Sequence, residues 1–185
     1  EDISKFSTGD SIHFELMFEE NIGYATNFNI IDNVEIFIQN ENDFWDEDDP
    51  YSPIDIGDTL TNVQFTDMFG NPVKLSDSDG KFRFISFIFT RCPMPNMCPA
   101  LLFKQKYLAE TLIDENIEII MISFDYIHDT PKILQNAYEA TFKNHPNWQM
   151  WSSHEHMDDL YKLSKQSMFG FWGVEENDIG HNMRC

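Results

Sequence analysis

Two cysteines at the ends of a short loop are the residues of this chain best suited to chemistry. Cys92 and Cys98 stand in the stretch Phe89–Pro99, which reads FTRCPMPNMCP and leaves five residues between them. Thiolates act as nucleophiles, close as disulfides, and are soft ligands that select copper(I) over hard cations. The stretch therefore predicts either soft-metal binding or thiol redox chemistry.

The segments on either side of this loop are expected to position the two thiols. An apolar run, Phe82–Phe89, leads into the loop and has the length and composition of a central strand. A helix-patterned run, Ala100–Asp114, leads out, and Pro99 suits its first turn. Because a helix N-terminus carries unpaired N–H groups and partial positive charge, we predict a lowered pKa for Cys98.

Other uses of the two cysteines are less favoured by the sequence. Prolines on both sides predict an exposed loop rather than a pair of buried core thiols. A structural zinc site takes four protein ligands, more than two cysteines supply. Redox motifs of the thioredoxin type space their cysteines by two residues, whereas five separate these. Met94 and Met97 could add thioether ligands or simply pack.

A third metal ligand would come from the histidines. His181 is the best candidate because it follows a glycine in a loop-like segment beyond the hydrophobic elements. His154 and His156 resemble a metal pair, but residues two apart do not share a helix face. The remaining histidines are His13, His128 and His145.

The order of apolar segments predicts an α/β fold. A second buried strand is expected at Ile117–Phe124, and a strand–helix–strand unit of this length implies a parallel pair with a right-handed connection. Asp129-Thr130-Pro131 is a helix-start signal. A short strand at Trp148–Trp151 and a further helix follow, which completes a sheet flanked by helices.

The chain divides into three parts by composition. Residues 1–40 contain alternating apolar positions typical of a β-hairpin, and an isolated hairpin is marginal in water. Residues 41–58 hold eight acidic and no basic residues, which favours a solvated linker over a loose metal site. Residues 59–185 form the main domain. A second hairpin is expected at Leu60–Leu75.

Charge and hydropathy exclude several classes of protein. The formal net charge is −20, so no nucleic acid is expected as a partner. No apolar run is long enough for a membrane-spanning helix, and no signal peptide is visible. The chain begins at Glu1, so we expect a removed leader or anchor, or a fragment. Membrane association would then need the missing anchor.

The loop and its surroundings resemble the Sco/SenC family, the copper chaperones of cytochrome oxidase assembly. Cys92–Pro99, CPMPNMCP, is similar to a long CPxPxxCP form found in a bacterial subgroup. Asp67–Leu75 resembles the family's lead-in turn. Ser123–Pro131 is similar to its S-x-D-P-x-x-D-T-P segment, with Tyr126 in place of the proline.

The resemblance implies a thioredoxin-like fold with a central mixed sheet flanked by helices. It implies that Cys92, Cys98 and His181 bind one copper ion, since Asp178–His181 falls where the family places its copper histidine. It further implies a metallochaperone without a small-molecule substrate. The partner would be the copper-receiving subunit of a terminal oxidase, in the periplasm or on the outer face of the cytoplasmic membrane.

Two departures from the family and two rival functions stay open. The family's last strands and helix have no counterpart after Asn182, and Cys185 has none in the family pattern. The N-terminal hairpin is similar to the closing strands of a CusF-like copper-binding module. A thiol–disulfide oxidoreductase would use Cys92 and Cys98 without His181, and a peroxidase would need a reactive Cys92.

Overall fold

The computed structural model describes residues 10–19, 22–33, 44, 51–113, 115–175 and 178–182. The chain separates into two compact units, Glu1–Gln39 and Asn40–Cys185. Among the described residues, no helix is long and apolar enough to cross a bilayer.

The first unit contains the antiparallel hairpin predicted from the alternating pattern. Its strands are β1 (Asp10–Glu19) and β2 (Ile22–Asn33). The rings of Phe14 and Phe28 lie 5.7 Å apart across the two strands. Phe14 nevertheless stays 43% exposed, so the hairpin by itself buries little apolar surface.

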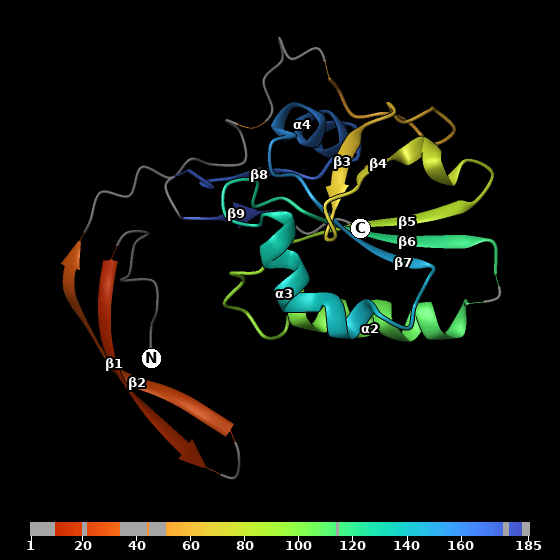
Figure 1. The fold of residues 1–185 in the computed structure, drawn as a ribbon. Helices are drawn as coiled ribbons and strands as arrows, with labels where there is room; N and C mark the ends of the chain where they lie inside the picture. The colour runs from red at the N-terminus through yellow and green to blue at the C-terminus, as the bar shows by residue number, and fades with distance from the viewer. Residues whose placement is uncertain are drawn as a thin grey trace. The chain divides into compact units, whose positions relative to one another are not determined.

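The second unit is a mixed sheet with helices on both faces (Figure 1). Strands β5, β6 and β7 are parallel, and β3 runs antiparallel to β7 and to β4. In Figure 1, α2 and α3 lie on one face of the sheet and α4 lies on the other. The bounds of these elements are β3 Gln64–Asp67, β4 Pro72–Lys74, the 3-10 turn η2 Leu75–Ser78, β5 Phe82–Ile88, α2 Cys98–Thr111, β6 Ile117–Ser123, α3 Pro131–Phe142, β7 Trp148–Ser152, α4 Met157–Gln166, β8 Phe171–Trp172 and β9 Gly180–His181.

The middle of the sheet is the best-buried part of the fold. Ile119–Ile122 in β6 are fully buried, which fits a parallel strand covered on both faces. The predicted α/β class, the hairpin before β5 and the strand–helix–strand unit around α2 are confirmed.

The prediction of a central strand at Phe82–Phe89 is wrong. The strand order is β4-β3-β7-β6-β5, so β5 lies at the end of the sheet with β6 as its neighbour among the described strands. Its apolar residues are buried unevenly, because Phe82 is 78% exposed whereas Ile88 is 1% exposed. The end that leads into the cysteine loop is therefore the well-packed end.

Part of the segment predicted as a solvated linker packs on this unit. Phe44 is 6% exposed, with its ring 5.3 Å from that of Phe171 and 5.0 Å from the ammonium of Lys165. The backbone N–H of Ile54 donates to the carbonyl of Gln166 at the end of α4. The residues that make these contacts, Phe44 and Ile54, are apolar residues of an otherwise acidic segment.

Candidate metal centre

The two cysteines lie at opposite ends of the loop that joins β5 to α2. α2 begins at Cys98 with Pro99 in its first turn, as predicted. A turn within the loop is closed by the N–H of Met97, which donates to the carbonyl of Met94 over 3.1 Å. Both thiols are free, Cys92 half-buried and Cys98 only 7% exposed.

The predicted low pKa of Cys98 is wrong. The pKa of Cys98 is raised to about 12, mainly by burial, with a further contribution from the neighbouring Cys92 thiol and an opposing one from the Phe89 backbone. The expectation of an exposed loop therefore fails at its helical end. Desolvation of the thiolate outweighs the field of the helix N-terminus here.

Hydrogen bonds from a distant loop fix the two residues that precede Cys92. Arg91 binds the buried carboxylate of Asp125 with two nitrogens, Nε at 2.8 Å and Nη2 at 2.7 Å. The N–H of Thr90 donates to Asp129 Oδ2 at 2.8 Å, and its hydroxyl donates to Oδ1. Charge-assisted contacts of this kind restrict where Cys92 can lie.

Asp125, His128 and Asp129 form the one group of three possible metal ligands whose donor atoms come within 4.8 Å of one another in the described ranges. Their oxygens already accept hydrogen bonds, however. The N–H of His128 donates to Asp125 Oδ1 at 3.1 Å, and Ser123 Oγ donates to Asp129 Oδ2 at 2.5 Å. The group therefore acts as a polar clamp on the cysteine loop rather than as a metal site.

His181 lies in β9, opposite Phe171 of β8. Its ring lies 5.2 Å from the ring of Phe124 and 6.0 Å from that of Phe89, which adjoins the cysteine loop. Nδ1 lies 2.8 Å from the carbonyl of Asn182. Because a carbonyl only accepts, Nδ1 carries the proton and the lone pair stands on Nε2, the tautomer that suits a metal ligand.

A cleft separates the cysteine loop from the segment that carries His181. Its volume is about 410 Å³, and its walls are Phe89, Arg91 and Pro93 on one side and Asp178 and Ile179 on the other. The cysteine loop and the segment that leads to His181 thus face each other across one opening. The two sulfur atoms and the imidazole nitrogen do not all come within 4.8 Å of one another.

His154 and His156, which resemble a metal pair in the sequence, have separate partners. His154 Nδ1 donates to the carbonyl of Tyr126 over 2.8 Å, whereas His156 Nε2 lies 3.1 Å from Thr66 Oγ1. These two side chains therefore have different partners, on different elements.

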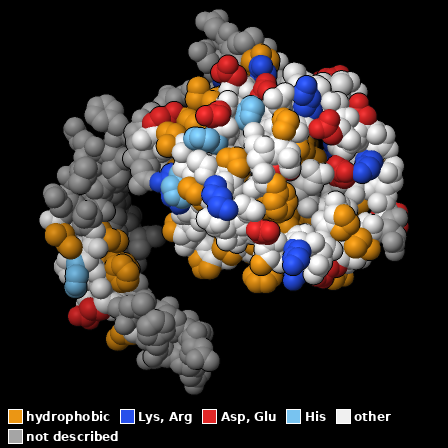
Figure 2. Space-filling model, in the orientation of Figure 1, with side chains coloured by type: hydrophobic (Ala, Val, Ile, Leu, Met, Phe, Trp, Pro, Cys, Tyr) orange, Lys and Arg blue, Asp and Glu red, His pale blue; other side chains and the backbone are white. Residues whose placement is uncertain are grey.

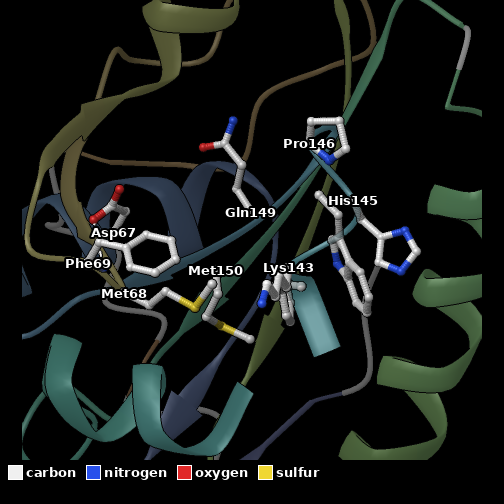
Figure 3. A pocket seen from close by; sticks show the side chains of 10 residues that line it. Asp67, Met68, Phe69, Lys143, His145, Pro146, Gln149 and Met150 are labelled. Carbon is white, nitrogen blue, oxygen red and sulfur yellow. Dashed lines mark hydrogen bonds between the residues drawn. The ribbon is translucent and has the colours of Figure 1, made fainter. Parts of the chain in front are cut away.

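A second cavity, of about 300 Å³, lies between the β3–β4 turn and the start of β7 (Figure 3). Met68 and Met150 line it and are joined by a backbone hydrogen bond of 3.1 Å. Asp67 also lines it, but its carboxylate accepts from the N–H groups of Phe69 and Asn71 and so belongs to the turn. No cysteine is among its walls.

Residues 56–147 match the family model described as SCO1/SenC, and the matched region includes both loop cysteines. This domain therefore belongs to the SCO1/SenC family. The match ends before His181, so the histidine comes from outside the matched residues. No curated protein is significantly similar to the chain in sequence.

Solved structures of Sco proteins share the fold. A SCO1/SenC family lipoprotein from Bacillus anthracis aligns with a TM-score of 0.58 and 23% identity over 66% of this chain and 73% of its own. Copper-bound ScoI from Bradyrhizobium japonicum aligns with a TM-score of 0.55 and 22% identity, and the alignment covers 68% of this chain and 79% of ScoI. BsSco is described as a member of the Sco family of cytochrome c oxidase assembly proteins. It aligns with a TM-score of 0.50 and 24% identity, over 63% of this chain and 67% of BsSco. The fold is therefore thioredoxin-like, as predicted.

Proposed function

We propose that this protein is a copper chaperone that binds one copper ion through Cys92, Cys98 and Nε2 of His181. Two soft thiolates with one imidazole are a donor set that suits copper. The observation that carries the proposal is the shared cleft, with the cysteine loop on one wall and the segment leading to His181 on the other.

Binding requires two local changes. The donor atoms must approach, because they are not all within 4.8 Å of one another. Cys98 must also lose its proton, although burial raises its pKa to about 12. A metal ion supplies the charge that makes this loss favourable, since ligating thiols are deprotonated outright. Copper binding would therefore release protons.

The copper is cargo rather than a resident cofactor in this proposal. A partner with comparable soft ligands would take it by ligand exchange, and BsSco's description as an oxidase assembly protein supports a terminal oxidase subunit as that partner. The B. anthracis relative is a lipoprotein, which supports a location outside the cytoplasm, with the periplasm as the expected compartment. On the face shown in Figure 2, acidic and basic side chains are interspersed. A protein partner therefore suits this face better than nucleic acid.

The test is an anaerobic Cu(I) competition titration of the reduced chain. We expect one tight copper in the wild type, its loss in Cys98→Ser, and weaker binding in His181→Ala. His156→Ala is the matched control, because His156 contacts Thr66 instead of the cleft. Unchanged affinity and stoichiometry in Cys98→Ser would refute the proposal.

The rival function is thiol–disulfide exchange with partner proteins. It is favoured by the closeness of the two free thiols, which lie within hydrogen-bonding reach of each other. Cys92 is the more accessible nucleophile, but the raised pKa of Cys98 keeps that thiol protonated at neutral pH. Reduction of a partner disulfide that persists in His181→Ala, without tight copper, would favour the rival.

A further inference from the structure

One segment contacts both halves of the proposed copper site. Phe124–Asp129 joins β6 to α3. On one side, Asp125 and Asp129 hold the two residues before Cys92. On the other side, the ring of Phe124 lies 5.2 Å from the ring of His181.

Tyr126 stands in the middle of this segment and contacts the hairpin that carries His181. Its side chain is 9% exposed, its hydroxyl donates to Glu175 Oε1, and its ring lies 6.4 Å from that of Phe171. Its own carbonyl accepts from His154 Nδ1 at 2.8 Å. The backbone of Tyr126 is thus fixed while its hydroxyl reaches the β8–β9 turn.

The β8–β9 hairpin has few hydrogen bonds of its own. Each strand has two residues, and such a pair is marginal without external contacts. Near the strand ends, Asn182 exchanges hydrogen bonds with Gly170, its N–H donating over 2.9 Å. At the turn end, the contact with Glu175 ties the hairpin to the segment that holds the cysteine loop.

We propose that Tyr126 is a positioning residue for His181. By holding Glu175, its hydroxyl fixes the turn end of the β8–β9 hairpin, so that the imidazole stays beside Phe124, just after the cleft-lining residues Asp178 and Ile179. The consequence for copper rests on the proposed function, but the effect on the hairpin does not. In the family segment that this stretch resembles, proline stands in place of Tyr126 and offers no hydroxyl.

The first arm of the test measures amide hydrogen exchange of β9 in the reduced, copper-free chain. Tyr126→Phe removes only the hydroxyl, and we expect exchange in β9 to become about fivefold faster. Glu175→Ala is expected to do the same, whereas Glu175→Gln keeps an acceptor oxygen and should restore slow exchange. Tyr107→Phe is the matched control, because Tyr107 is 67% exposed on α2. Equal exchange in Tyr126→Phe and Tyr107→Phe would overturn the proposal.

The second arm measures Cu(I) affinity in two backgrounds. We expect Tyr126→Phe to weaken binding about threefold to tenfold in the wild type and to add nothing in His181→Ala, since the hydroxyl acts through the histidine. Equal weakening in both backgrounds would overturn the positioning role. If the wild type does not bind copper through His181, the proposed function fails, and the exchange arm still decides whether Tyr126 fixes the hairpin.

Discussion

The guanidinium of Arg91 binds Asp125 through two nitrogens, although 34 residues separate them in the chain. This ion pair stands one residue before Cys92. The carboxylate of Asp125 is fully buried and the side chain of Arg91 is 31% exposed, so the pair is shielded on one side only. An electrostatic contact to a distant segment therefore anchors the loop at the residue before Cys92.

Arg91→Met should destabilise the chain, because it leaves the carboxylate of Asp125 buried without its cation. Breaking a fully buried pair costs about 3–5 kcal/mol, and partial exposure of Arg91 reduces the expected loss to about 1–3 kcal/mol. Urea unfolding measures the change. Lys106→Met is the control, since Lys106 pairs with the exposed carboxylate of Glu110 at 3.9 Å, and it should cost about 0.5 kcal/mol or less. Equal losses in both variants would contradict the anchoring role.

Stability should fall as pH rises above about 9, in a manner that depends on Cys98. Burial raises the pKa of Cys98 from 9.0 in the unfolded chain to about 12, so the folded state favours the protonated thiol. This contribution is fully present below pH 9 and is lost as pH rises toward 12. Thermal unfolding followed from about pH 8 up to about pH 11 measures it, because this interval begins where the contribution is fully present and covers most of its loss.

Cys98→Ala should flatten this alkaline part of the profile, whereas Cys92→Ala should leave most of it, because burial of Cys98 is the larger cause. The same protonated state should make Cys98 slower than Cys92 toward iodoacetamide at neutral pH. A Cys98→Ala profile that falls as steeply as the wild type would show that other groups cause the decline.

Gly173→Ala should loosen the turn that leads to His181. Gly173 has φ +70, and an added Cβ would lie 2.0 Å from the carbonyl oxygen of Asp178. Strain and clash together predict a loss of about 1–3 kcal/mol, measured by urea unfolding. Gly70→Ala is the control, because its φ of +89 brings strain but its Cβ would meet no atom within 4 Å. A smaller loss at Gly173 than at Gly70 would contradict the close approach.

Local sequence patterns predicted where the elements that carry the site begin and end. They did not predict which elements lie next to one another in space. The apolar run before the cysteines, Pro99 after them and the helix-start signal at Thr130 each act within a few residues, and β5, α2 and α3 formed where expected. The edge position of β5 was missed, because periodicity reports burial and not which strand lies alongside.

The electrostatics of the site depended on tertiary contacts that one sequence does not reveal. The low pKa expected for Cys98 followed from the helix start alone, whereas packing around the loop buries the thiol and reverses the direction. The hydrogen bonds by which Asp125 and Asp129 hold the cysteine loop were also not predicted. Both residues lie in the segment that resembles the family, but they were interpreted there only as a motif and a helix start.

The most direct measurement is X-ray absorption at the copper edge of the reduced chain loaded with one equivalent of Cu(I). The account predicts two sulfur neighbours and one imidazole nitrogen, with the nitrogen lost in His181→Ala and one sulfur lost in Cys98→Ser. His156→Ala should leave the spectrum unchanged. A nitrogen that persists in His181→Ala, or a spectrum unaffected by Cys98→Ser, would contradict a centre built from Cys92, Cys98 and His181.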